Sequence, residues 1–105
     1  MNIPKLIRDG KVAILISRGY GAGWYTWHYD KRLLFEPKIV EMLDDGADPH
    51  EIKSYCEKTY GDELYYGGVH GLEVHWLPIG TQFKIDEYDG AETLIISNEV
   101  RWITA

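Results

Sequence analysis

KVAILIS, residues 11–17, is the stretch that decides the fold. Its middle, Val12 to Ile16, is continuously apolar and rich in β-branched side chains, which is typical of a strand covered on both faces. Asp9-Gly10 precedes it and is a turn signal. We therefore expect residues 11–17 to form the central strand of a sheet, entered through a turn.

Two helices are predicted in the middle of the chain. The first spans residues 36–45, where Pro37 suits the first turn and apolar side chains follow at helical spacing. The second begins at Asp48, a capping residue with Glu51 at the capping-box position, and it ends at Gly61. We expect the two helices to form an antiparallel pair or a layer packed against the sheet.

The last third of the chain is predicted to be β structure. Apolar and polar side chains alternate over residues 72–77 and 83–86, and Asp89-Gly90 is typical of a tight type I′ hairpin. Further short strands are expected at residues 94–96 and 100–103. The predicted order is β-α-α-β-β-β-β, an α+β fold with a mainly antiparallel sheet of about five strands and a two-helix layer.

Composition favours a single domain covering residues 1–105. One apolar core can form at this length, and 45% apolar with 27% charged residues is ordinary for a globular protein. The single cysteine, Cys56, excludes an internal disulfide. The longest apolar run, residues 12–16, is too short to cross a bilayer or to form the core of a signal peptide. We expect a soluble, cytoplasmic protein that has no membrane partner.

Charge is unevenly distributed along the chain. The net charge is −6, yet residues 1–35 carry six basic and two acidic side chains, a local net of +4. The overall charge argues against binding long nucleic acids, because such binding requires many phosphates to be neutralised. A small anion would instead be attracted to the basic third of the chain. The alternative is that this segregation arises by chance.

RGYGAGWYTWH, residues 18–28, is the strongest candidate for a binding site. It lacks the dinucleotide fingerprint G-x-G-x-x-G, because Trp24 stands where the last glycine is required, and it has no phosphate-loop ending. Successive glycines nevertheless let backbone N–H groups converge on an anion, and aromatic rings stack on a nucleobase. A second glycine-aromatic stretch, GDELYYGGVHG at residues 61–71, repeats this chemistry. The candidate ligand-binding residues are Arg18, Gly19, Tyr20, Gly21, Gly23, Trp24, Tyr25, Trp27, Lys31, Arg32, Tyr65, Tyr66 and His70.

A structural interpretation of the same residues stays open. The aromatic side chains can plug one end of the sheet or fill an oligomer interface, because Tyr and Trp are common both in small-ligand sites and in subunit contacts.

Signals for chemistry beyond binding are weak. Nitrogen and oxygen ligands for a metal are present, but their spacing matches no known motif: His70, Glu73, His75 and Asp86. Cys56 falls on the apolar face of the second predicted helix, which disfavours a nucleophile. We expect no metal, no cofactor and no catalytic residue, so the protein is not predicted to be an enzyme.

Three blocks of sequence carry a resemblance to other proteins. DGKVAILISRGYGAGWYTW at 9–27, LLFEPKIVEML at 33–43 and GTQFKIDEYDGAETL at 80–94 resemble a family of small bacteriophage proteins of about this size. Small phage proteins of this kind include counter-defence proteins, among them oligomeric sponges that sequester cyclic or ADP-ribose-derived nucleotides of bacterial immunity. The resemblance implies a phage-encoded protein in the host cytoplasm and assigns no catalytic residue.

Two classes of function remain as hypotheses. The first is a non-enzymatic homo-oligomer that sequesters a small anionic, nucleotide-like signalling molecule between residues 18–28 and 65–71. The alternative is a protein-interaction module that inhibits a host protein through the same aromatic residues, or a structural oligomer-forming phage protein. A hydrolase that uses the histidines is a third and weaker hypothesis.

Overall fold

The computed structural model describes residues 3–19 and 21–96. Tyr20 and the strand predicted at residues 100–103 lie outside the described residues. The strands are β1 (Ile7–Arg8), β2 (Lys11–Ser17), β3 (Leu72–Pro78), β4 (Phe83–Tyr88) and β5 (Ala91–Ile96). The helices are α1 (Tyr25–His28), α2 (Lys31–Leu34), α3 (Pro37–Asp44), α4 (Pro49–Tyr60) and the 3-10 helix η1 (Gly67–Gly71).

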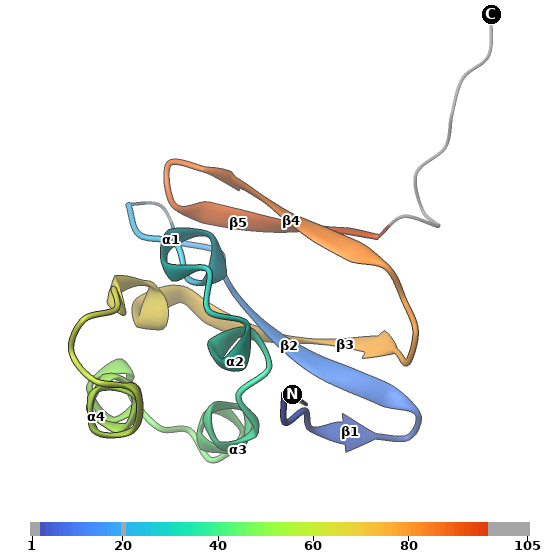
Figure 1. Ribbon diagram of the computed structural model, residues 1–105, viewed down its shortest axis with the longest axis horizontal. Helices are drawn as coiled ribbons and strands as arrows, with labels where there is room; N and C mark the ends of the chain where they lie inside the picture. Colours follow the sequence, from blue (N-terminus) through green and yellow to red (C-terminus); the bar gives the residue numbers. More distant parts are fainter. Residues whose placement is uncertain (1–2, 20, 97–105) are drawn as a thin grey trace, which may run out of the picture.

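Strand β2 is the middle strand of a three-stranded antiparallel sheet, as its sequence predicts. It pairs with β1 on one side and β3 on the other (Figure 1). Val12 lies opposite both Ile7 and Leu77. The turn between β1 and β2 has Asp9 at φ 52° and Gly10 at φ 75°, the positive angles of a two-residue hairpin.

Both faces of β2 are covered, which explains its unbroken apolar sequence. Ala13 and Leu15 pack into a core cluster that includes Ile52 of α4. Ile14 belongs to a second cluster, against which Leu94 of β5 packs. Figure 1 shows α3 and α4 on one side of β2 and the β4–β5 hairpin on the other. The core is therefore built around β2 from two sides.

The two predicted helices are confirmed. Helix α3 begins at Pro37, and α4 begins at Pro49 after the Asp48 side chain, which accepts the Glu51 N–H at 3.0 Å. Gly61 follows the last residue of α4 with φ 88°, a conformation that glycine adopts without strain. Capping residues and proline positions thus fixed both helix starts.

The α+β class is confirmed, but the prediction of one five-stranded sheet is wrong. Among the described residues, β4 and β5 pair with each other and form a separate two-stranded antiparallel sheet. The hairpin folds over the second face of β2 because that face is apolar and needs cover, which a strand added at the sheet edge would not supply. No helix of the described residues is long and apolar enough to span a membrane.

Candidate functional site

The two glycine-aromatic stretches lie against each other through direct backbone contact. An added Cβ on Gly68 would overlap the Gly23 carbonyl, and one on Gly71 would lie 2.8 Å from the Gly19 nitrogen. The Arg18 N–H donates to the Gly71 carbonyl at 3.0 Å. Only residues without a Cβ allow the two segments to approach this closely. These glycines therefore join two parts of the fold.

The turn of the β4–β5 hairpin closes on the same stretch. The Gly21 N–H donates to the Asp89 carbonyl at 2.6 Å, and a Cβ on Gly90 would overlap the backbone of Ala22. The N–H in the middle of the predicted anion cradle is thus already used within the protein.

A buried carboxylate fastens this hairpin to the end of β2. Glu92 is 0% exposed and accepts hydrogen bonds from the Ser17 N–H at 2.7 Å and the Thr26 N–H at 2.8 Å. The Thr26 hydroxyl donates a third bond at 2.7 Å. The three donors satisfy the carboxylate in its buried place and fix the first residues of α1 relative to β2 and β5.

Two of the predicted stacking residues belong to the core. Trp24 is 0% exposed, and its Nε1–H donates to the Leu33 carbonyl at 3.1 Å. Tyr66 is 3% exposed, lies 6.4 Å from Trp24 between ring centroids, and donates its hydroxyl to the Gly61 carbonyl at 2.6 Å. Neither ring presents a face to a ligand, which agrees with the alternative that these aromatic side chains plug the end of the sheet.

A second aromatic pair from the same two stretches is exposed. Trp27 of α1 and Tyr65, before η1, have ring centroids 5.2 Å apart and planes inclined by 31°. Trp27 is 40% exposed and Tyr65 49% exposed. The Trp27 Nε1–H donates to Glu87 Oε2 at 3.2 Å, which connects this pair to the end of β4.

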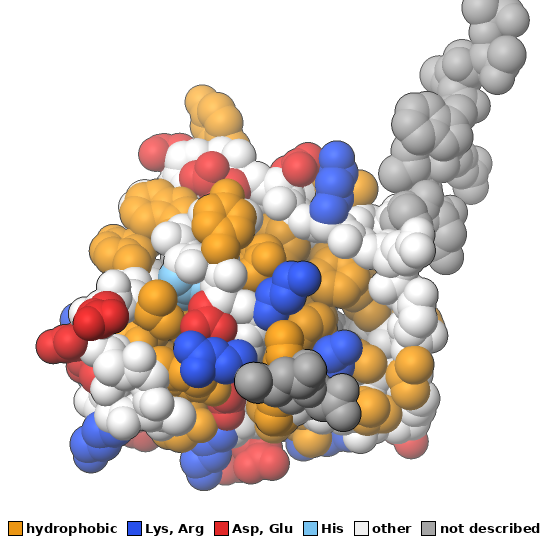
Figure 2. All heavy atoms as spheres, in the orientation of Figure 1, with side chains coloured by type: hydrophobic (Ala, Val, Ile, Leu, Met, Phe, Trp, Pro, Cys, Tyr) orange, Lys and Arg blue, Asp and Glu red, His pale blue; other side chains and the backbone are white. Residues whose placement is uncertain are grey.

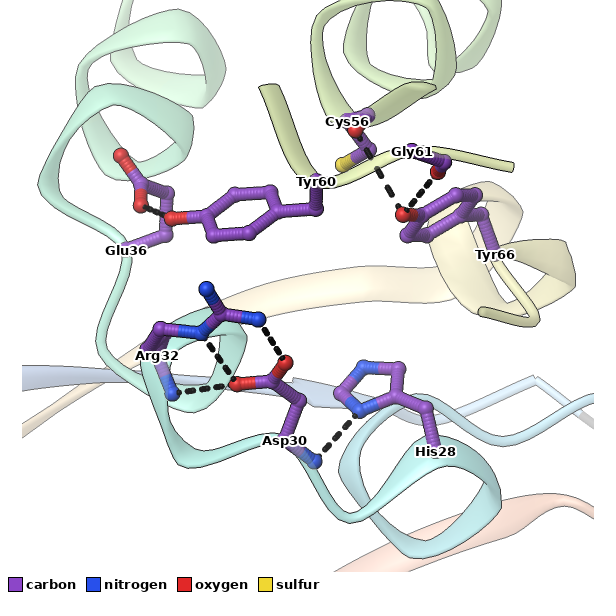
Figure 3. Close-up of polar contacts among 8 residues, drawn as sticks. All are labelled: His28, Asp30, Arg32, Glu36, Cys56, Tyr60, Gly61 and Tyr66. Carbon is purple, nitrogen blue, oxygen red and sulfur yellow. Dashed lines mark hydrogen bonds and ion pairs between the residues drawn. The ribbon is translucent and has the colours of Figure 1, made fainter. Parts of the chain in front are cut away.

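Figure 3 shows a polar cluster around α2 and α4. The Arg32 guanidinium donates to both carboxylate oxygens of Asp30, at 3.0 and 2.6 Å, and lies 4.8 Å from the ring centroid of Tyr60. These bonds hold the pKa of Asp30 below its usual range. Arg32, a candidate ligand-binding residue, is therefore already paired within the chain.

Beside this ion pair, the same cluster keeps an imidazole and two phenol groups neutral. His28 Nδ1 accepts the Asp30 N–H at 2.9 Å, and burial lowers the pKa of His28 to about 4. Glu36 accepts the Tyr55 hydroxyl at 2.8 Å and also the Tyr60 hydroxyl. Burial raises the pKa of Tyr55 to about 12 and that of Tyr60 further above its usual range. Neutral imidazole and phenol groups at physiological pH fit a structural hydrogen-bond network.

A cavity of about 880 Å³ lies between the segment before β1, α2 and strand β4. Two residues singled out from the sequence, Tyr25 and Lys31, line it. The other lining residues are not among the predicted site residues: Ile3, Lys5, Leu34, Phe35, Phe83, Lys84 and Ile85. Lysines from three chain segments thus share the cavity with aromatic and aliphatic side chains, and none of the described residues that line it is acidic. In Figure 2, Lys and Arg side chains lie beside exposed hydrophobic ones on the face shown.

The remaining candidates lie elsewhere. His70 is exposed and packs edge-on to His50, with ring centroids 6.1 Å apart, whereas His75 Nε2 lies 3.7 Å from Glu73 Oε1. In the part of the chain that the structure describes, no three His, Cys, Asp or Glu side chains are grouped so that they could hold a metal. Cys56 is buried, and burial raises the pKa of its thiol to about 12, which disfavours the reactive thiolate.

Comparison of the chain with known protein families, curated proteins and solved structures gives no match.

Proposed function

We propose that the protein binds and holds a small anionic ligand with a flat apolar part, such as a nucleotide, in the cavity lined by Lys5, Lys31 and Lys84. The observation that carries the proposal is the charge of the lining. A chain with a net charge of −6 has a cavity that is lined, within residues 3–19 and 21–96, by three lysines and no acidic residue. Such a lining attracts anions while most of the chain repels them.

The cavity also suits the apolar part of such a ligand. Phe35 and Phe83 contribute aromatic rings inclined by 83°, and Tyr25 adds a third aromatic side chain. Stacking of a nucleobase on an aromatic ring contributes roughly 1–3 kcal/mol. A volume of about 880 Å³ falls within the usual range of small-molecule sites, about 300–1,000 Å³. One nucleotide or dinucleotide is therefore of suitable size.

The lining favours binding without chemistry. The lining residues that the structure describes include no carboxylate, imidazole or thiol that would act as a general base or nucleophile. We therefore infer sequestration rather than turnover, as in the counter-defence sponges that the sequence resemblance brings into consideration. Homo-oligomerisation of the chain stays a prediction.

Isothermal titration calorimetry with cyclic di-AMP and ADP-ribose tests the proposal, with adenosine as the uncharged comparison. We expect heat of binding for at least one of the anions and weaker binding of adenosine. The double variant Lys31→Gln/Lys84→Gln should bind about tenfold or more weakly, because each lost charge-assisted contact removes on the order of 1 kcal/mol.

Lys53→Gln is the matched control, since this exposed lysine of α4 does not line the cavity. It removes one positive charge and should leave affinity within about twofold. Absence of binding by every anionic probe, or equal affinity in the double variant, would refute the proposed site.

A further inference from the structure

The exposed pair Trp27 and Tyr65 has acidic residues on both sides. Asp62 and Glu63 precede Tyr65 and are exposed. On the other side, Glu87 accepts both the Trp27 Nε1–H and the Gly90 N–H, at 3.2 and 2.7 Å, so the acidic turn of the β4–β5 hairpin adjoins the pair. We call this the acidic aromatic surface: Trp27, Asp62, Glu63, Tyr65 and Glu87.

The segments that form this surface contain no lysine or arginine that would neutralise it. Residues 24–30, 61–71 and 86–92 include neither Lys nor Arg. Exposed aromatic rings among acids that form no ion pair with any described residue make a surface complementary to a cationic group that is also flat.

The chain itself shows which group fits this combination. Arg8 donates to Asp44 at 3.0 Å and lies 5.3 Å from the Trp76 ring centroid. Arg32 is held in the same way by Asp30 and Tyr60. Twice, then, a carboxylate and an aromatic ring together hold an arginine. The acidic aromatic surface offers the same two groups without an arginine from the described residues.

We propose that the acidic aromatic surface docks an arginine-containing basic segment of a partner protein. A guanidinium group stacks flat on Trp27 or Tyr65 while its fork of N–H donors meets the neighbouring carboxylates. Lysine satisfies the charge but not the stacking, so the surface discriminates between the two. Nucleic acids and anionic membranes are repelled by the same carboxylates. This inference is independent of the ligand in the lysine-lined cavity.

Fluorescence anisotropy with three labelled nonapeptides tests the inference: four arginines spaced by glycines, the same peptide with lysines, and the same peptide with aspartates. We expect the arginine peptide to bind most tightly, the lysine peptide at least threefold more weakly, and the aspartate peptide not at all. Trp27→Ala and Tyr65→Ala should each weaken arginine-peptide binding fivefold or more. Asp62→Asn/Glu63→Gln should weaken it and reduce its salt dependence.

Ile79→Ala is the matched control, because Ile79 is 61% exposed and lies in the turn between β3 and β4. Urea unfolding of each variant separates lost binding from lost folding. If one aromatic variant does not fold, the other still tests the proposal. Equal binding of the arginine and lysine peptides, or unchanged binding in both aromatic variants, would overturn the proposal. So would self-association of the protein through this surface in place of peptide binding.

Discussion

Glu92 is a single side chain on which three parts of the protein depend. Its carboxylate comes from β5 and accepts bonds from Ser17 at the end of β2 and from Thr26 at the start of α1. Hydrogen bonds to a buried charged group contribute more than neutral ones, and leaving their donors unpaired is costly. The position of the glycine-aromatic stretch is therefore sensitive to this one residue.

Glu92→Gln should destabilise the protein by about 2–4 kcal/mol, because the amide directs N–H groups at donors that need an acceptor. Urea unfolding monitored by tryptophan fluorescence measures the change. Glu73→Gln, an exposed glutamate of β3, is the control and should change stability by less than about 0.5 kcal/mol. Equal midpoints for the two variants would contradict the structural role of Glu92.

His28 should make the fold sensitive to acid. Its pKa of about 4 in the folded protein lies below the ordinary value of 6.5, chiefly because of burial. The unfolded chain therefore takes up the proton more readily, so the contribution of His28 is complete above about pH 6.5 and is lost as the pH falls towards 4. The free energy of unfolding therefore decreases as the pH falls.

Urea midpoints at pH 7 and pH 5 test this dependence. His28→Gln should be less stable than the native protein at pH 7, since the bond from Asp30 N–H to Nδ1 is lost. Between the two pH values, however, the variant should lose less stability. An identical loss in both proteins would show that His28 is not the responsible group.

The role of each side chain in the candidate site was the feature that the sequence predicted least well. The sequence shows four aromatic residues within residues 18–28 but not their directions, and Trp24 faces the core whereas Trp27 faces solvent. Trp24 precedes α1 with non-helical angles, φ −105° and ψ −97°, so its side chain does not follow the helical spacing that would place it on the same face as Trp27. No local pattern marks Glu92 as buried or Lys5 as part of a cavity, because both depend on contacts between distant segments.

Among the helices and strands, the sequence predicted those features that depend on neighbouring residues within one segment. Helices α3 and α4 were recognised because caps, prolines and apolar spacing act within one chain segment. Helices α1 and α2 have four residues each, too few for a helical period to be visible. The separate β4–β5 sheet was missed because strand alternation shows that a strand has two unlike faces, without showing which neighbour it pairs with.

Helix η1 depends on glycine where it crosses the residue 18–28 stretch. Gly68→Ala should destabilise the protein by about 1–3 kcal/mol, because the new Cβ overlaps the Gly23 carbonyl and backbone must move. Gly19→Ala is the control: its Cβ would meet its nearest neighbour at 3.9 Å, so a much smaller change is expected. Thermal unfolding of both variants measures the two losses of stability. A loss in Gly68→Ala as small as that in Gly19→Ala would contradict the close packing.

The whole molecule brings together charges that are separate in sequence. Lys5, Lys31 and Lys84 lie in the N-terminal segment, α2 and β4, and they share one cavity only because the β4–β5 hairpin folds over β2. The basic first third of the chain indicated attraction of a small anion. The charge distribution did not indicate where on the protein the anion would bind, since Lys84 comes from the acidic remainder of the sequence.

The most direct test of the proposed site is its location in solution. Amide chemical shifts in ¹H–¹⁵N spectra should be followed while cyclic di-AMP or ADP-ribose is added to the full chain. The lysine-lined cavity predicts that the largest changes fall on residues 3–5, 31–35 and 83–85. Changes confined to residues 18–28 and 65–71 would instead place the ligand on the glycine-aromatic stretches and contradict the proposed site.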